Sequence, residues 1–144
     1  MNRQNILSDL LTQLETITTD NDYSTDIGAN ASYWDVYPDD YAGPPTVTFC
    51  DRDEDSEKVN RYYNQTLHVE ITAIAYTTGA NKLADSCNLL ADLMKATVQT
   101  RWTNYANIVR PVSNSKEIEG KGKQAIAVTL NIDIEYREET LIGW

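Results

Sequence analysis

Residues 125–136 read AIAVTLNIDIEY, and this stretch decides the fold. Every second side chain is apolar or aromatic, and small or polar side chains fill the positions between. Because side chains of a β-strand point alternately to its two faces, this pattern predicts a strand over residues 124–136 with one buried face and one solvated face. The expected buried face consists of Ile126, Val128, Leu130, Ile132, Ile134 and Tyr136.

The same alternation extends to an earlier segment, which predicts a partner strand over residues 63–76. Leu67, Val69, Ile71, Ala73 and Ala75 share one face of it, and Thr66, His68, Glu70 and Thr72 share the other. Shorter strands are expected at 46–49 and, within a polar irregular segment over 19–43, at 33–37. Residues 111–119 are expected to form an edge strand, because Pro111 has no N–H to donate to a central ladder. The GKG at 120–122 is typical of a turn.

Two segments have helical periodicity, over residues 3–18 and 80–99. The first stripe is Ile6, Leu7, Leu10, Leu11, Leu14 and Ile17, and the second is Leu83, Cys87, Leu90, Met94 and Val98. Each helix has one apolar stripe to bury, and each long strand has one apolar face. We therefore expect an α+β fold in two layers, a mainly antiparallel β-sheet with two amphipathic helices packed on one face. The 144 residues suit a single domain over 1–144.

The charge is distributed unevenly along the chain, whose net charge is −10. Residues 1–57 hold 13 acidic and 2 basic side chains, whereas residues 58–144 hold 9 and 10. An acidic surface repels phosphates and anionic lipids, so we expect neither specific nucleic-acid binding nor membrane binding. The two cysteines, Cys50 and Cys87, form no CxxC pair, and we expect both to be reduced in the cytosol. No stretch has the length and apolarity of a membrane span.

The acidic stretch FCDRDEDSE at 49–57 resembles a calcium-binding loop at first sight. Asp51, Asp53 and Asp55 match the first, third and fifth positions of such a loop. The sixth position is Ser56 instead of glycine, and the twelfth is Tyr62 instead of a bidentate glutamate. The pattern therefore favours an exposed acidic loop between two strands, with no metal or other cofactor.

Catalytic signals are sparse. His68 is the single histidine, it lies on the polar face of its expected strand, and no nucleophile is identifiable near it. The chain contains no Walker loop, GxGxxG, GxSxG or HExxH motif. Nine tyrosines and three tryptophans stand against one phenylalanine, and such polar-tipped rings suit hydrated interfaces. We therefore expect an interaction protein and no enzyme.

The order of the segments resembles that of the tail terminator proteins of long-tailed bacteriophages. The resemblance covers nearly the whole chain and rests on element order, most tellingly on the helix directly after the long strand and on the final alternating strand that ends in tyrosine. Its pieces, after the N-terminal helix, are GPP (43–45), TVTF (46–49), NQTLHVEITAIAY (64–76), NKLADSCNLLADLMKATV (81–98) and AIAVTLNIDIEY (125–136).

This resemblance implies a structural virion protein without catalytic residues. Tail terminators form a ring, typically a hexamer, that caps the tube of major tail protein, stops its growth and offers the surface that joins the head. The implied partners are further copies of the chain, the major tail tube protein and a head–tail connector or stopper protein. The implied location is the head-proximal end of the tail, after assembly in the host cytoplasm.

Two sets of residues are expected to act in such a ring. The acidic stretch is expected to face the lumen and keep DNA from adhering, through Asp51, Asp53, Glu54, Asp55 and Glu57. The apolar segment at the end of the sequence is expected to contact a neighbouring subunit, through Leu141, Ile142 and Trp144. Two alternatives stay open: another neck protein, such as a stopper or adaptor, and a small metal-dependent hydrolase that uses Asp51, Asp53 and Asp55.

Overall fold

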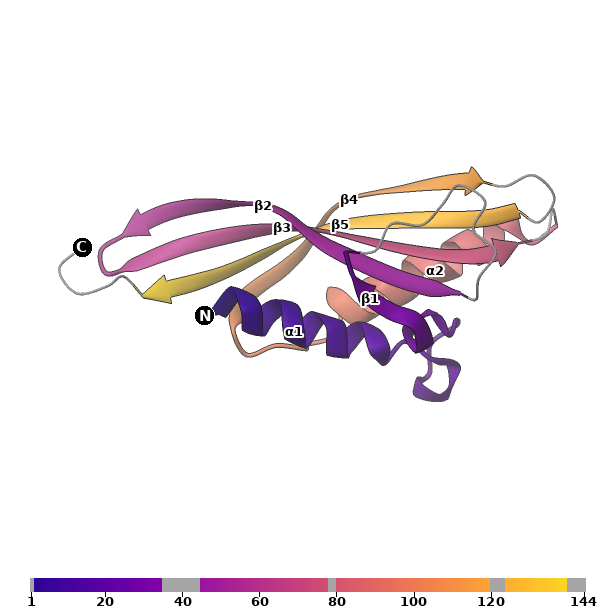
Figure 1. The fold of residues 1–144 in the computed structure, drawn as a ribbon, viewed down its shortest axis with the longest axis horizontal. Helices are drawn as coiled ribbons and strands as arrows, with labels where there is room; N and C mark the ends of the chain where they lie inside the picture. The colour runs from indigo at the N-terminus through magenta and orange to yellow at the C-terminus, as the bar shows by residue number, and fades with distance from the viewer. Residues whose placement is uncertain (1, 35–44, 78–79, 120–123, 140–144) are drawn as a thin grey trace.

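The computed structural model describes residues 2–34, 45–77, 80–119 and 124–139. Five strands form one sheet in the order β1-β2-β3-β5-β4 (Figure 1). Their bounds are β1 Ala31–Tyr33, β2 Thr46–Val59, β3 Tyr62–Thr77, β4 Ala106–Glu119 and β5 Gln124–Glu139. β1 runs parallel to β2, and the other three pairs are antiparallel. The expected edge position of the strand that contains Pro111 is confirmed, because β4 pairs with β5 at one side of the sheet.

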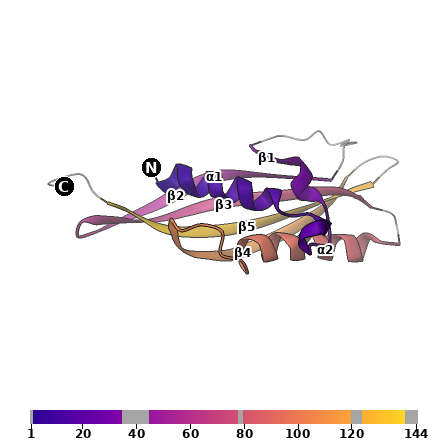
Figure 2. The same ribbon diagram turned by 90° about the horizontal axis from the view of Figure 1, so that it is seen from below.

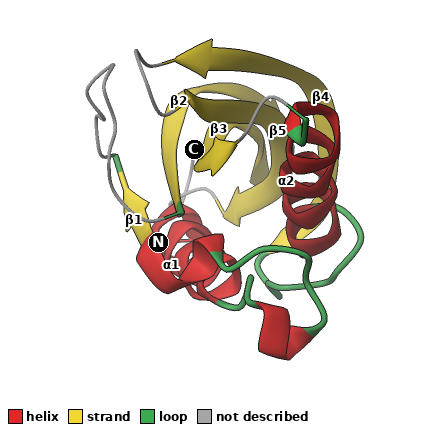
Figure 3. Ribbon diagram, turned by 90° about the vertical axis from the view of Figure 1, so that its right-hand side faces the viewer, coloured by secondary structure: helices red, strands yellow, loops and turns green. Residues whose placement is uncertain are grey.

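Two helices, α1 (Asn2–Glu15) and α2 (Lys82–Thr97), lie on the same side of the twisted and curved sheet (Figures 2 and 3). Two short 3₁₀ turns, Thr19–Asn21 and Ile27–Asn30, connect α1 to β1. The structure thus confirms the predicted α+β class, with a mainly antiparallel sheet and both helices on one face.

The core lies between the helices and the sheet. All six residues of the predicted apolar face of β5 are buried, as are Leu67, Val69 and Ile71 of β3. They pack with Ile6, Leu10 and Leu14 of α1 and with Leu89 and Leu93 of α2. Because β3 and β5 pair over their whole length, their apolar faces form one continuous surface for the helices.

The predicted acidic loop is wrong, because residues 49–57 lie inside β2. Strand pairing between β2 and β3 continues to Val59 and Tyr62, with a register shift between Asp51 and Asp53. Asn60 follows β2 with φ 56°, a left-handed conformation that asparagine tolerates better than most residues. β3 pairs with all of these positions except Arg52, which lies at the register shift, so their charge does not prevent strand formation.

The predicted apolar stripe of α2 is also wrong. Leu83 is 75% exposed and Cys87 is exposed, whereas Leu90, Met94 and Val98 are half-buried at the margin of the core. The buried face instead consists of Ser86, Leu89, Asp92, Leu93, Ala96 and Thr97. Its polar members have hydrogen-bond partners, which removes most of the cost of burying them.

The irregular segment after α1 is anchored on α2. The Asp92 carboxylate accepts hydrogen bonds from the backbone N–H groups of Ser24, at 3.0 Å, and Thr25, at 2.8 Å. The Lys95 ammonium donates to the backbone carbonyl of Asp22 at 2.7 Å and lies 4.5 Å from the centre of the Tyr23 ring. The strand predicted at 33–37 begins and ends earlier, at Ala31–Tyr33. Most of that range, and the turn predicted at 120–122, lie outside the described residues.

Candidate functional site

The hairpin of β2 and β3 reaches beyond the helices. Figure 1 shows its turn far past the N-terminus of α1, and we call residues 55–66 the arm. Every residue from 55 to 62 is exposed. Near the turn, Val59 is 41% exposed and Tyr62 is 43% exposed. The arm therefore carries two large apolar side chains beyond the core that the described residues form.

A shallow apolar groove of about 460 Å³ lies elsewhere on the molecule, between α1 and the start of the sheet. We call it the α1 groove, and it is lined by Arg3, Gln4, Leu7, Ser8, Leu11, Tyr33 and Phe49. The Tyr33 and Phe49 rings are in tilted contact, with centroids 5.2 Å apart. Trp34, 57% exposed, packs edge-on against Tyr33. An exposed patch of this composition is typical of an interface.

A polar cluster joins the start of α1 to β2. Arg3 pairs with Asp51 and reaches Glu54 at 3.5 Å. Asp51 also accepts a hydrogen bond from the Tyr33 hydroxyl, and Glu54 accepts one from the Tyr136 hydroxyl at 2.7 Å. These bonds hold Tyr33 in the wall of the α1 groove and fix the base of the arm to α1.

The titration of this cluster follows from the same contacts. Burial by itself would raise the pKa of the Asp51 carboxyl, but hydrogen bonds from Tyr33 and Arg3 outweigh it and lower that pKa below its usual value. The bond to Asp51 raises the pKa of Tyr33 to about 12. Burial, followed by the bond to Glu54, raises the pKa of Tyr136. At neutral pH these phenols therefore remain donors and the carboxylate remains an acceptor.

The face of the sheet opposite the helices, which we call the open face, carries an ionic network. His68 Nδ1 lies 2.6 Å from Asp133 on β5, and its Nε2 lies 2.9 Å from Asp55 on β2. The bond to Asp55, then that to Asp133, raises the pKa of His68 to about 8. Two further ion pairs lie on this face, Arg52 with Glu70 and Arg110 with Glu135. In each, a guanidinium nitrogen lies 2.6 Å from a carboxylate oxygen. The network connects all four long strands, and His68 joins three of them.

The structure divides the five acidic residues expected to face a lumen. Asp51 and Glu54 lie opposite Val69 and Leu67, on the helix side of the sheet, where they serve the Arg3 cluster. The other three lie on the open face and are exposed. In the strand register, Asp53, Asp55 and Glu57 lie opposite His68, Thr66 and Asn64. The residues expected at a subunit contact, Leu141, Ile142 and Trp144, lie outside the described residues.

The division of the acidic residues also bears on the hydrolase alternative. Asp51 lies on the opposite side of β2 from Asp53 and Asp55, so the three carboxylates do not converge. Across the described ranges, no group of three or more His, Cys, Asp or Glu side chains is arranged to hold a metal ion.

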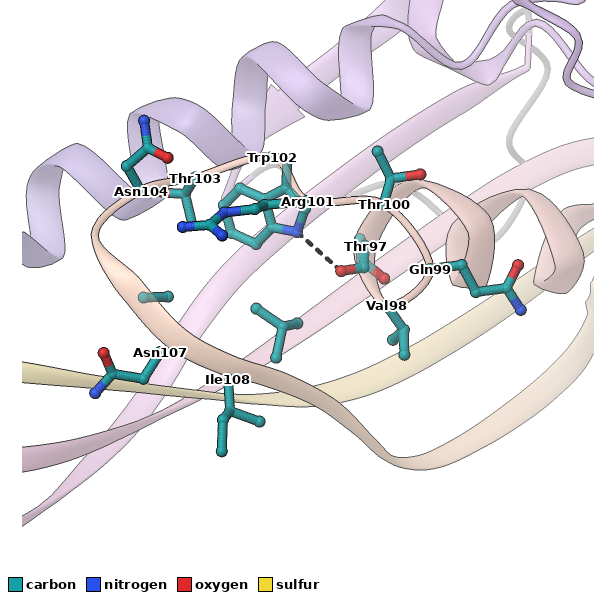
Figure 4. A pocket seen from close by; sticks show the side chains of 12 residues that line it. Thr97, Val98, Gln99, Thr100, Arg101, Trp102, Thr103, Asn104, Asn107 and Ile108 are labelled. Carbon is teal, nitrogen blue, oxygen red and sulfur yellow. Dashed lines mark hydrogen bonds between the residues drawn. The ribbon is translucent and has the colours of Figure 1, made fainter.

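A second hollow of about 460 Å³ lies beside the connection from α2 to β4 (Figure 4). The Trp102 indole N–H donates to the Thr97 carbonyl at 2.9 Å and holds this loop against the end of α2. Gln99, Arg101, Asn104 and Asn107 are the other polar residues that border it, together with threonines. Of the lining residues, Arg101 alone is ionisable, so this hollow offers no acid–base pair.

Sequence reasoning missed both the arm and the α1 groove. One signal was present for the groove: the predicted stripe of α1 contains two adjacent apolar pairs, Ile6–Leu7 and Leu10–Leu11, so it covers more of the helix surface than one buried face requires. The structure buries Ile6, Leu10 and Leu14 and leaves Leu7 and Leu11 half-buried in the groove wall. For the arm, the run of acidic residues over 51–57 predicted a loop, whereas these residues form part of β2.

In the described part of the chain, neither helix has the length and apolarity required to cross a membrane. A comparison of the chain with models of known protein families finds no match, and a comparison with curated proteins likewise finds none.

Proposed function

We propose that this protein is a structural virion protein that forms a ring, caps the phage tail tube, ends its growth and offers the surface that joins the head. The proposal starts from the resemblance in element order to tail terminator proteins. The helices and strands of the α+β fold follow the element order on which that resemblance rests.

The single observation that carries the proposal is that one chain exposes apolar side chains on two unlike surfaces. The arm projects with Val59 and Tyr62 near its turn, and the α1 groove is recessed and lined by leucine and aromatic side chains. A projection and a complementary recess at different places on one molecule favour head-to-tail association, which closes into a ring when the rotation between neighbours permits. A role in assembly explains why such surfaces are exposed.

The edge strand β4 contributes less to this argument. It exposes Ile108, Val112 and Ile118, but Pro111 interrupts its capacity to donate, and its register shifts twice. Proline and bulges are devices that blunt a sheet edge against further strand pairing. We therefore assign the contact between copies to side chains and not to an extended sheet.

The open face supplies the lumen-facing surface in this proposal, in a narrower form than the sequence suggested. Asp53, Asp55 and Glu57 remain exposed there, while Asp51 and Glu54 are engaged by α1. A negative inner wall repels the phosphates of DNA over a Debye length of roughly 8–10 Å at physiological salt. The network that contains Arg52 and Arg110 limits the net charge of the remaining open face.

Tube growth in vitro tests the proposal. Purified protein is added to the matching major tail protein while it polymerises, and tube lengths are measured by electron microscopy. We expect shorter tubes that no longer elongate when fresh major tail protein is supplied. Tubes of unchanged length that still elongate at both ends would reject a terminator, and binding to the portal complex instead would favour a stopper or adaptor.

A further inference from the structure

We propose that residues 140–144, the segment that follows β5, dock in the α1 groove of their own chain. The segment lies outside the described residues and reads TLIGW. Leu141, Ile142 and Trp144 are expected above to contact a neighbouring subunit, and the α1 groove is an apolar surface of their own chain within their reach. The inference goes beyond the proposed function, because it concerns the single chain. In the proposed ring, a neighbour gains access to the α1 groove only when this segment leaves it.

The end of β5 is fixed beside the start of α1. The Asn2 side-chain amide donates to the Arg137 carbonyl at 2.9 Å, and the Asn2 backbone N–H donates to the Glu138 carboxylate at 3.0 Å. Arg3, the next residue of α1, already belongs to the groove lining. The strand ends at Glu139, two residues after Arg137. The segment therefore begins close to the first residue of the groove.

Five residues are enough to reach the groove. Two residues of strand carry Glu139 about 7 Å beyond Arg137, and Leu7 lies about 8 Å along α1 from Asn2. The groove lies over β2, two strands from β5, which adds about 10 Å sideways. The direct path is therefore about 18 Å, at the upper end of the roughly 16–18 Å that five extended residues span. The Trp144 side chain extends beyond its own backbone, so it reaches Leu7.

The groove matches the chemistry of this segment. Leucine and aromatic side chains line it, and its volume of about 460 Å³ lies within the usual range of roughly 300–1,000 Å³ for binding pockets. None of residues 140–144 has a charged side chain, so docking buries no charge from the segment. Arg3, the one charged member of the lining, is already paired with Asp51 and Glu54 and needs no charged occupant.

The rim of the groove offers a partner for the indole N–H of Trp144. A buried tryptophan usually donates this N–H to an acceptor. Gln4 and Ser8 are exposed members of the lining, and neither side chain makes a hydrogen bond to another described residue. Both carry an oxygen that is able to accept. The groove therefore suits a ring whose apolar body fills the recess and whose polar edge stays at the rim.

The short tether favours the groove of the same chain over that of a second copy. A group joined to its site by a few residues is present there at an effective concentration in the millimolar range. A segment from a second copy competes only at the concentration of the protein itself, which is lower in a dilute sample. We therefore expect the contact within one chain.

Disulfide trapping tests this contact in the full-length protein. Both native cysteines are first replaced by serine. In that background, Gln4→Cys with Gly143→Cys is expected to form a disulfide within one chain when a dilute sample is oxidised. Asn5→Cys with Gly143→Cys is the matched control, because Asn5 lies at the same level of α1 but outside the groove lining. After correction for the reactivity of each cysteine with a small thiol reagent, the control should close at least about tenfold more slowly.

Adding Trp144→Glu to the Gln4→Cys pair should remove most of this advantage, because a charged side chain does not enter an apolar recess. Equal closure rates for the two pairs would overturn the inference, since a segment that is not docked meets both positions alike. Disulfides that join different chains would overturn it as well.

Nuclear Overhauser effects in the native sequence provide a second readout. We expect cross-peaks between the Trp144 indole protons and the Leu7 methyl groups, and their absence after both groups are assigned would overturn the inference. Capping of tail tubes is measured separately. Capping by a protein that lacks this contact would therefore reject the inference and retain the proposed function, and the contact without capping would do the reverse.

Discussion

The same three strands, β2, β3 and β5, build two regions of different character. In the body, beneath α1 and α2, their side chains alternate between a buried apolar face and the ionic open face. In the arm they continue the same ladder, but residues 55–62 are exposed on both sides. The difference teaches that strand pairing extends the sheet beyond its own core. The body stabilises the fold, and the arm is left available for contact with other molecules.

The largest effect is expected in the body. Leu130→Ala removes a fully buried side chain from β5 and should lower the free energy of unfolding by about 2–5 kcal/mol. Val59→Ala is the matched truncation in the arm and should change it by less than about 0.5 kcal/mol. Urea denaturation measures both, and similar losses at the two positions would break the distinction between body and arm.

A smaller effect is expected where the body holds its irregular segment. Asp92→Ala leaves the N–H groups of Ser24 and Thr25 without their carboxylate and should cost about 1–3 kcal/mol. Hydrogen exchange provides the local readout, with faster exchange at Ser24 and Thr25. Asn88→Ala, at an exposed position of the same helix, is the control, and equal destabilisation by the two changes would contradict the anchoring role.

The stability contributed by His68, which bridges Asp55 of the arm and Asp133 of β5, should depend on pH. The pKa of folded His68 is about 8, above the ordinary 6.5, so the folded protein binds this proton more tightly than the unfolded chain does. The resulting stabilisation is present below pH 6.5 and is lost as the pH rises through about 8. Its size should be under about 1 kcal/mol, because Asp55 is largely exposed.

Melting temperatures of the wild type and of His68→Gln, compared from pH 6 to pH 9, measure this dependence. The advantage of the wild type should shrink as the pH rises. Asp133→Asn should reduce the dependence while keeping the shape of the side chain. A wild-type advantage that stays constant or grows with pH would show that the His68 bridges do not form as described.

The smallest effect on stability is expected near the turn of the arm. Tyr62→Glu should alter the free energy of unfolding by less than about 0.5 kcal/mol. Tyr62 is exposed, and it is neither a member of the buried core nor one of the partly buried residues packed against it. Chemical denaturation of the variant at a concentration where the wild type is monomeric checks this. A loss above 1 kcal/mol would mean that the tyrosine serves the fold.

Sequence patterns predicted the body well and the surfaces poorly. The alternation in β3 and β5 identifies a buried face without knowledge of the partners, because one whole face is apolar. The buried face of α2 was not predictable in this way, since the burial of Asp92 depends on backbone groups of Ser24 and Thr25 far away in the sequence. The arm depends on pairing with β3, and the groove depends on α1, β1 and β2 meeting. These are properties of tertiary structure.

The most direct measurement of the central claim is electron microscopy of the protein mixed with the matching tail tubes. Averaged end views and side views of the tube ends are compared with those of tubes alone. The account predicts a rotationally symmetric ring on one end of each tube, and its loss with Tyr62→Glu but not with Leu83→Glu. Tube ends without added density, or added density without rotational symmetry, would contradict it.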